Sequence, residues 1–377
     1  MHLSYEFKKI YKNKVFWFTV MSLIILNIFM LSADISLIVS DELYTPRKNL
    51  YNAVKGRLTK ESVIYIDEKY GELSEKVETG NYSTEYTDGT YSGYIFGDYN
   101  LFRELNEDLL RIYHYQERTS QMLEKVEANI DLFRIAGNEN KCKIYKKIKS
   151  VVSKRDIHSL YDYTAVNHYI NYDASSALLL IYISLVMPAV FSEEKEIHDL
   201  LDTTKTGHKK TEKWKLTFAL IHNLILSFIV FTVDFMWFAL FFGVEEMSAK
   251  LYYMSEYEYT WIQCTIWEYV LILLIMKLIA TGTFGILCAV ASRYIKKYMQ
   301  STAVCILSSI ILMQTAENML NPVNLIQGRN YFKQPAYVSL AGATMPLVFI
   351  PLICCVFTVV VFGLVLIKER NKKNGCI

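Results

Sequence analysis

The feature that most constrains this chain is a series of apolar runs, each long enough to cross a membrane. A hydrocarbon core of about 30 Å is crossed by about 20 helical residues. The sequence predicts six such spans, at 15–39, 174–192, 216–243, 266–291, 303–315 with its flanks, and 341–367. We expect the first run to be retained, because it exceeds the apolar core of about 7 to 15 residues found in a cleaved signal peptide. At 52% hydrophobic residues, the composition also favours a membrane protein.

Basic residues are distributed unevenly among the segments that connect these runs. They collect in the lead 1–14, in the segment 193–215, between the fourth and fifth runs (Arg293, Lys296 and Lys297), and in the tail 368–377. The loop after the third run instead carries one basic residue, Lys250, against four acidic ones: Glu245, Glu246, Glu256 and Glu258. Because lysine and arginine mark cytoplasmic loops, both termini are predicted to be cytoplasmic. The membrane is expected to be a bacterial plasma membrane. The expected fold is an all-α polytopic membrane protein with six transmembrane helices and a mainly helical extracellular domain between helices one and two.

The polar insert at 40–173 differs sharply in composition from the rest of the chain. Its apolar periodicity predicts helices at 59–77, 101–135 and 141–153, with Asn100 as an N-cap and turns or a hairpin at 80–100. Sixteen tyrosines lie between Tyr44 and Tyr172. They either form a rim that binds a peptide or lipid headgroups, or pack the domain in place of leucine and phenylalanine.

The seven cysteines do not form a disulfide framework. Four of them lie in the predicted spans and Cys376 lies in the tail, which leaves Cys142 and Cys264 on the predicted outer side. These two thiols could pair, but we favour the interpretation that both are free.

Motifs for catalysis by this chain are missing. The sequence has no P-loop for nucleotide phosphates, no H-E-x-x-H and no C-x-x-C, so we expect no metal, no cofactor and no ATPase activity on this chain. Glu245 and Glu246 form a carboxylate pair near a predicted membrane surface, a position that would suit a membrane-embedded protease. No matching histidine motif follows in the later spans. The interpretation as an enzyme is therefore disfavoured.

The most specific segment is "FSEEKEIHDLLDTTKTGHKKTEKWKL", residues 191–216, between the second and third predicted spans. Its acidic start suits a helix N-terminus, whose partial positive charge favours anions. The pattern predicts a short helix, a turn and a second amphipathic stretch on the inner membrane face. The residues we assign to this coupling segment are Glu193, Glu194, Glu196, Leu200, Leu201, Thr203, Thr204, Gly207 and Lys213.

This segment resembles the one after the second span in permease subunits of the type 2 ATP-binding-cassette exporter family. There, a phenylalanine and glutamates lead into a pattern with paired leucines, a hydroxylated residue and a basic residue before the third span. The chain departs from the family where Ile197 and His198 replace the usual glycine, and where Lys205 or Thr206 replaces the proline. The alternative is a basic loop that only follows the positive-inside rule.

The order of segments is also similar to that family. A basic amphipathic lead, one span, an outer insert and five further spans match its common layout, as does a broken segment at 317–346 with Pro322, Pro335 and Pro346. The resemblance implies that two permease subunits, in a homodimer or heterodimer, form the path. It further implies that two cytosolic ATPase subunits, which bind ATP and Mg²⁺, dock on the coupling segment.

Two ionisable residues lie deep within predicted spans: Asp234 in the third and Lys277 in the fourth. A charge at the bilayer centre costs at least about 2.5 kcal/mol, so each needs a partner or a wet pathway. Either they form a structural ion pair between helices, or they belong to a polar site on a substrate or ion route.

These features favour an exporter of a peptide, antibiotic or lipid-like substrate, with membrane lipid but no nucleic acid among its partners. One alternative is an ATPase-coupled mechanotransmission protein that moves its extracellular domain. Another is a membrane receptor that binds a ligand with that domain, although a receptor does not need six spans.

Overall fold

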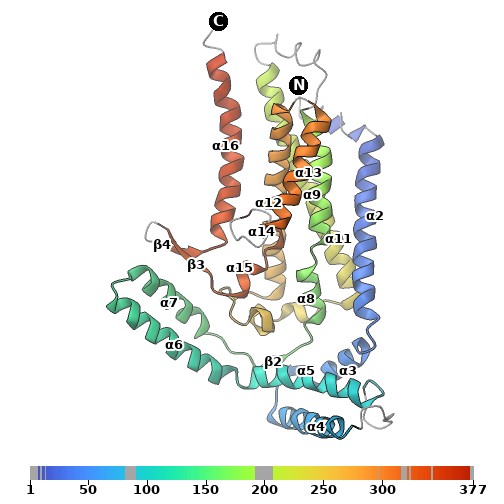
Figure 1. The fold of residues 1–377 in the computed structure, drawn as a ribbon, viewed down its shortest axis with the longest axis vertical. Helices are drawn as coiled ribbons and strands as arrows, with labels where there is room; N and C mark the ends of the chain where they lie inside the picture. Colours follow the sequence, from blue (N-terminus) through green and yellow to red (C-terminus); the bar gives the residue numbers. More distant parts are fainter. Residues whose placement is uncertain are drawn as a thin grey trace.

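The computed structural model describes residues 7–8, 11–12, 14–80, 91–191, 207–295, 297–315, 321, 324–340 and 343–373. Within them the chain is mostly helical, and a bundle of long helices runs along the long axis of the molecule (Figure 1). The bundle consists of α2 (Lys14–Val39), α9 (Ala174–Val186), α11 (Gly207–Phe242), α12 (Ile266–Tyr294), α13 (Tyr298–Gln314) and α16 (Phe349–Lys373). A second set of helices covers one end of this bundle.

Four stretches of the described chain are long and apolar enough to cross a membrane: Phe16–Val39, Thr164–Val190, Lys213–Phe242 and Ile266–Tyr294. They correspond to the first four predicted spans. The second includes α8 (Thr164–Asn171), α9 and the 3₁₀ helix η1 (Met187–Val190). The fifth and sixth predicted spans correspond to shorter apolar helices, Tyr298–Gln314 and Phe349–Val361. The chain is thus a helical protein with four candidate spans.

The predicted start of the last span at residue 341 is wrong. Residues Tyr337–Leu340 and Ala343–Pro346 form an antiparallel hairpin, β3 and β4, in which Tyr337 pairs with Pro346. Helix α16 begins only at Phe349. Pro351 lies in its first turn, where a missing N–H costs no helical hydrogen bond. The segment before α16 is therefore broken, as predicted, and also contains the short helices α14 (Asn324–Gln327) and α15 (Asn330–Lys333).

Helix α11 is the longest helix of the described chain. Its 36 residues correspond to about 54 Å, well over the 30 Å or so of a hydrocarbon core. It begins nine residues before the predicted span start at 216, because its polar first turns contain lysines and glutamate, which are good helix formers. It ends before Gly243, whose φ of 83° is the left-handed conformation that glycine provides after a helix.

Helices α11 and α12 approach closely at Gly285. A Cβ placed on Gly285 would lie 1.6 Å from Nδ2 of the buried Asn223 on α11. Only a residue without a side chain fits at this crossing. The two helices are therefore in direct contact at this crossing. Helix α12 also contacts α9, α13 and α16, while α2 packs on α9 and α11.

The insert at 40–173 forms a helical domain at one end of the bundle (Figure 1). Its elements before α8 are α3 (Tyr44–Val54), α4 (Lys60–Glu78), α5 (Ile95–Tyr113), α6 (Tyr115–Ile135), α7 (Glu139–Val152) and the paired strands β1 (Gly56–Arg57) and β2 (Ser159–Leu160). The predicted helices at 59–77 and 141–153 are confirmed by α4 and α7. Thr59 caps α4 through a reciprocal capping box with Ser62.

The predicted helix at 101–135 differs in two ways. It begins earlier, at Ile95, so Asn100 is not an N-cap; Asp98, in the first turn, accepts hydrogen bonds from the N–H of Ser92 at 2.7 Å and of Tyr91 at 3.1 Å. It is also broken at His114 into α5 and α6. The freed carbonyl of Arg111 accepts a 2.7 Å hydrogen bond from Arg118 Nη2. Residues 81–90 of the predicted turn region lie outside the described residues.

Tyrosines contribute to the packing of this domain. Tyr51 and Tyr115 are 3% and 2% exposed. Burial, with Asp108 nearby, raises the pKa of Tyr51, whose hydroxyl donates a 2.9 Å hydrogen bond to Asp108. Others, such as Tyr65 and Tyr113, are half exposed. The domain therefore contains both tyrosines that pack its interior and tyrosines on its surface.

The loop 244–265 between α11 and α12 attaches the domain to the bundle. It is folded into three 3₁₀ turns, η2 (Glu245–Ser248), η3 (Leu251–Tyr253) and η4 (Ser255–Tyr257). The buried Glu258 that follows forms ion pairs with Arg118 at 3.1 Å and Arg111 at 3.6 Å. Arg155 donates hydrogen bonds to the carbonyls of Glu258 and Thr260, and burial lowers the pKa of its guanidinium.

Three further contacts join the domain side of the molecule together. Glu256 pairs with Lys333 of α15 at 2.5 Å and accepts a 2.6 Å hydrogen bond from Asn167. Burial acts to raise the pKa of Glu256, but these hydrogen bonds hold it below its ordinary value. Lys147 on α7 donates to the carbonyl of Thr344 in β4 at 3.4 Å. The acidic residues of the loop thus hold the domain and the short helices in place.

Cys142 and Cys264, the two cysteines on the predicted outer side, are both free.

Candidate functional site

A cluster of polar side chains lies inside the bundle, around Asp234 of α11. Asp234 is 3% exposed, and its Oδ1 accepts a 2.5 Å hydrogen bond from Nδ2 of Asn27 on α2. Ser175, at the start of α9, interacts with the same carboxylate. Three helices therefore meet at one acidic group.

Lys277 of α12 is the basic member of the cluster. Its Nζ lies 4.7 Å from the centroid of the Phe231 ring, a cation–π distance. Its charge interacts with those of Asp234 and Asp173. Lys277 and Asp234 are both described, and their charged atoms lie more than 4.0 Å apart, beyond ion-pair distance. The direct ion pair that the sequence suggested is therefore not formed. The two charges act on each other at longer range.

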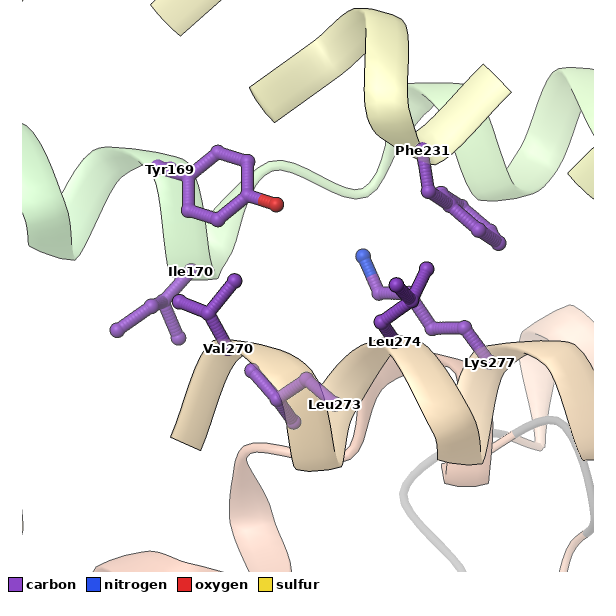
Figure 2. Close-up of a pocket in the computed structure, with 7 residues that line it drawn as sticks. All are labelled: Tyr169, Ile170, Phe231, Val270, Leu273, Leu274 and Lys277. Carbon is purple, nitrogen blue, oxygen red and sulfur yellow. The ribbon is translucent and has the colours of Figure 1, made fainter. Parts of the chain in front are cut away.

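A small cavity separates the lysine from Tyr169. Figure 2 shows the Tyr169 hydroxyl and the Lys277 amine directed toward the same space, with Phe231 on the opposite side. The cavity has a volume of about 20 Å³ and is otherwise lined by Ile170, Val270, Leu273 and Leu274. A polar cavity above about 10 to 15 Å³ can hold one water molecule. The cavity therefore has about the size of one water molecule.

A second pair of charges completes the cluster toward the domain. Asp173, just before α9, forms a 2.9 Å ion pair with Arg329, from the turn between α14 and α15. Arg329 also donates to the carbonyl of Asn171 at 3.0 Å. Two carboxylates and two basic groups thus balance in formal charge. The arrangement draws on α2, α8, α9, α11, α12 and the α14–α15 turn, so one polar cluster connects all of these elements.

The three cluster residues on long helices lie at similar depths. Asp234 is eight residues from the end of α11 at Phe242, Lys277 is eleven from the start of α12 at Ile266, and Asn27 is twelve from the end of α2 at Val39. At 1.5 Å per residue these separations are about 12, 17 and 18 Å. In a hydrocarbon core of about 30 Å, these groups would lie within the membrane, where ionisable residues are rare and generally functional.

Most of the predicted coupling segment lies outside the described residues. This applies to Glu193, Glu194, Glu196, Leu200, Leu201, Thr203 and Thr204. The other two are placed: Gly207 is the first residue of α11 and Lys213 is an exposed residue in its second turn. The segment therefore leads directly into the helix that contains Asp234.

The described part of the N-terminal lead packs against the same half of α11. The rings of Phe7 and Phe218 meet edge-on at 4.9 Å. Tyr11 and Tyr182 lie within hydrogen-bond distance of the two nitrogens of the buried His222, at 3.2 and 3.4 Å. The lead, α9 and α11 are thus joined near the predicted coupling segment, through a histidine to which the sequence assigned no role.

Within the part of the chain that the structure describes, no group of three or more His, Cys, Asp or Glu side chains could hold a metal ion. Comparison with protein-family models, curated proteins and solved structures finds no match to this chain. The fold and the site therefore define only the class of protein. It is a helical membrane protein with a polar cluster inside its bundle and a helical domain at one end.

Proposed function

We propose that this chain is the permease subunit of an ATP-binding-cassette exporter. It couples ATP hydrolysis by two separate cytosolic ATPase subunits to the export of a peptide, antibiotic or lipid-like substrate. In this proposal the chain has six spans and works beside a second permease subunit in a bacterial plasma membrane. Both termini are cytoplasmic and the helical domain is extracellular.

The observation that carries the proposal is the continuity of α11. One helix runs from Gly207, at the end of the coupling segment, past Asp234 to Phe242, at the loop that holds the domain. A helix without a break transmits a displacement at one end to the other. An ATPase that moves the coupling segment would therefore move the polar cluster and the domain with it.

The contacts of α11 support this role in transmission. Gly285 lets α12 approach it closely, and Asp234 connects it to α2 through Asn27. Its far end leads through Gly243 into the loop 244–265, where Glu258 binds two arginines of the domain. A shift of α11 would reach both the interior of the bundle and the domain.

A second function is favoured by a specific observation, the small size of the cavity in the bundle. At about 20 Å³ it is far below the 300 to 1,000 Å³ or so of a typical small-molecule site. A substrate path would therefore have to form between two subunits. The alternative is that the chain transports nothing and uses ATP hydrolysis elsewhere to move its domain, as a mechanotransmission protein.

The test is charge reversal in the coupling segment, Glu194→Lys with Glu196→Lys. The full chain is co-expressed with the ATPase encoded beside it, and both co-purification and stimulation of ATP hydrolysis are measured. We expect both to be lost, because the acidic start of the segment would meet the ATPase. The matched control reverses two exposed lysines of the domain, Lys48→Glu with Lys60→Glu, and should leave both readouts unchanged.

Normal coupling in the Glu194/Glu196 double variant, or the absence of any Walker A protein encoded nearby, would overturn the proposal. Such a result would favour the alternative that the chain is a membrane receptor that binds its ligand with the domain. Transport of a labelled peptide into inverted vesicles then separates an exporter from a mechanotransmission protein, since only the exporter accumulates cargo.

A further inference from the structure

The helical hairpin formed by α6 and α7 extends sideways from the rest of the domain. Figure 1 shows it projecting beyond α16, with α7 beside β3 and β4. It has a small core of its own, in which Val126 and Ile130 of α6 pack on Cys142 of α7. The hairpin is thus a stable projection of the domain.

The base of this projection is held at the end of a membrane helix. Lys147 of α7 donates to the carbonyl of Thr344, and its Nζ lies 5.4 Å from the centroid of the Tyr337 ring. Thr344 is five residues before Phe349, where α16 begins. The first part of α16, Phe349–Val361, is apolar. If it begins the sixth span of the proposed function, α7 lies at the level of the bilayer surface on the domain side.

The tip of the projection is apolar and exposed. Ile135, the last residue of α6, is 89% exposed, and Leu132, one turn earlier, is 59% exposed. Gly137, with a φ of 68°, then reverses the chain into α7. These two large aliphatic side chains are therefore available for burial against another apolar surface, which would be favourable.

Helix α7 adds positive charge beside this tip. Its 14 residues contain one glutamate, Glu139, and five lysines: Lys141, Lys143, Lys146, Lys147 and Lys149. Lys149 pairs with Glu127, and Lys141 lies over Phe133. Lys143 and Lys146 are exposed and form no ion pair with any residue that the structure describes. Their charge is available to an anionic surface.

We infer that the α6–α7 hairpin docks on anionic lipid headgroups of the membrane that the bundle spans. Ile135 and Leu132 enter the boundary between headgroups and acyl chains, while Lys143 and Lys146 bind lipid phosphates. Apolar residues beside a basic helix are the combination that holds an amphipathic element in this interface. The inference does not depend on an ATPase partner. It assigns the hairpin a second, lateral attachment to the bilayer.

A site-specific photo-crosslinker tests this inference in the full chain. Ile135→benzoylphenylalanine is prepared, with Tyr65→benzoylphenylalanine as a control on α4, where the native side chain is 50% exposed. Each protein is reconstituted in nanodiscs of phosphatidylcholine alone or mixed with phosphatidylglycerol. Lipid adducts are measured by intact mass after illumination. We expect adducts at position 135 and few at position 65, with the yield rising at least about fivefold with phosphatidylglycerol.

The lysines are tested in the same assay. Lys143→Glu with Lys146→Glu should reduce the yield in the mixed nanodiscs to that in phosphatidylcholine alone, while Lys48→Glu with Lys60→Glu should not. Equal yields at positions 65 and 135, no adduct at 135, or a crosslinked dimer of the chain would each overturn the inference. The dimer would identify a second copy as the partner of the tip. The comparison of adduct yields at position 135 between the two kinds of nanodisc uses the native lysines. A folding defect in the double lysine variant therefore cannot affect that comparison.

Discussion

Arg118 Nη2 lies 3.1 Å from Oε1 of Glu258, and the glutamate side chain is only 5% exposed. The arginine belongs to the helical domain and the glutamate to the loop between α11 and α12. Arg111, also from the domain, lies 3.6 Å from the other carboxylate oxygen. One buried carboxylate therefore binds two arginines, and the domain and the bundle are joined at this point.

Replacing Glu258 should release the domain from the loop. Glu258→Ala removes this carboxylate from both arginines. The cost should be below the roughly 3 to 5 kcal/mol of a fully buried pair, because Arg118 is 40% exposed and Arg111 keeps Asp108 at 3.5 Å. We expect a lower free energy of unfolding and faster hydrogen exchange in the loop 244–265. Chemical denaturation and exchange mass spectrometry of the purified chain measure the two effects.

Glu117→Ala is the matched control for Glu258. Glu117 forms an ion pair with His114 at 3.3 Å, but its side chain is 66% exposed. An exposed pair contributes about 0 to 1 kcal/mol, so the two variants should differ clearly. Equal effects would mean that Glu258 does not hold the domain.

A proline in the first turns of α11 should interrupt coupling without preventing membrane insertion. Lys213→Pro removes a helical N–H and costs about 3 kcal/mol in a helix interior. The apolar part of the span, from Leu216 onward, is unchanged. A loss of about 1.4 kcal/mol of coupling free energy corresponds to a tenfold change. In the proposed complex we therefore expect ATPase stimulation to fall more than about tenfold.

Lys213→Ala, at the same exposed position, keeps the helix and should retain stimulation. The two variants are compared at equal amounts of protein in membranes. Full stimulation with Lys213→Pro would show that the continuity of α11 is not required.

Substitutions at Asp234 separate its charge from its hydrogen bond. Asp234→Asn keeps an oxygen that can accept from Asn27 and should leave the thermal midpoint nearly unchanged. Asp234→Ala leaves the Asn27 amide unpaired, which costs about 1 to 3 kcal/mol. Thermal unfolding in detergent distinguishes them, and a midpoint for the asparagine variant as low as that for the alanine variant would contradict the contact.

The charge swap Asp234→Lys with Lys277→Asp should fail to restore function lost in the single variants. The two groups are not in direct contact, so exchanging them does not restore a pair of charges. Restoration of transport or ATPase stimulation by the swap would instead indicate a direct ion pair in the working state.

Cys264 should react with alkylating reagents only at high pH. Burial, with the nearby Glu268 carboxylate, raises the pKa of its thiol to about 11. Because the thiolate is the reactive form, the alkylation rate of the folded chain should rise through about pH 11 rather than through the pKa of about 8.5 of a free cysteine. Mass spectrometry of the Cys264 peptide follows the rate, and the denatured chain is the control. A midpoint near 8.5 in both would contradict the buried environment.

Spans with sharp polar boundaries could be predicted closely from the sequence. The starts of α2 and α12 lie within one residue of the predicted 15 and 266, because charged or polar residues come directly before a long apolar run. The start of α11 could not be found in this way, since Gly207 and the lysines after it are polar and yet helical. The start of α16 was placed too early because hydropathy does not distinguish a strand such as Ala343–Pro346 from a helix.

The site was predictable only where charge interrupts an apolar run. That signal identifies Asp234 and Lys277. Asn27 lies in such a run but is uncharged, and Arg329 comes from a polar turn that only the fold brings to Asp173. The role of Glu258 was hidden for a similar reason. In the sequence it counts toward the acidity of a loop, whereas its arginine partners are more than a hundred residues away.

The break at His114 has a consequence for how the domain can move. The domain is held by its chain connections to α2 and α9, by Glu258 through Arg111 and Arg118, and by Thr344 through Lys147. The break itself is bridged from outside, because Glu258 binds Arg111 before it and Arg118 after it. Arg118 also donates to the carbonyl of Arg111 across the break. A displacement of the loop 244–265 would therefore act on α5 and α6 at the same point.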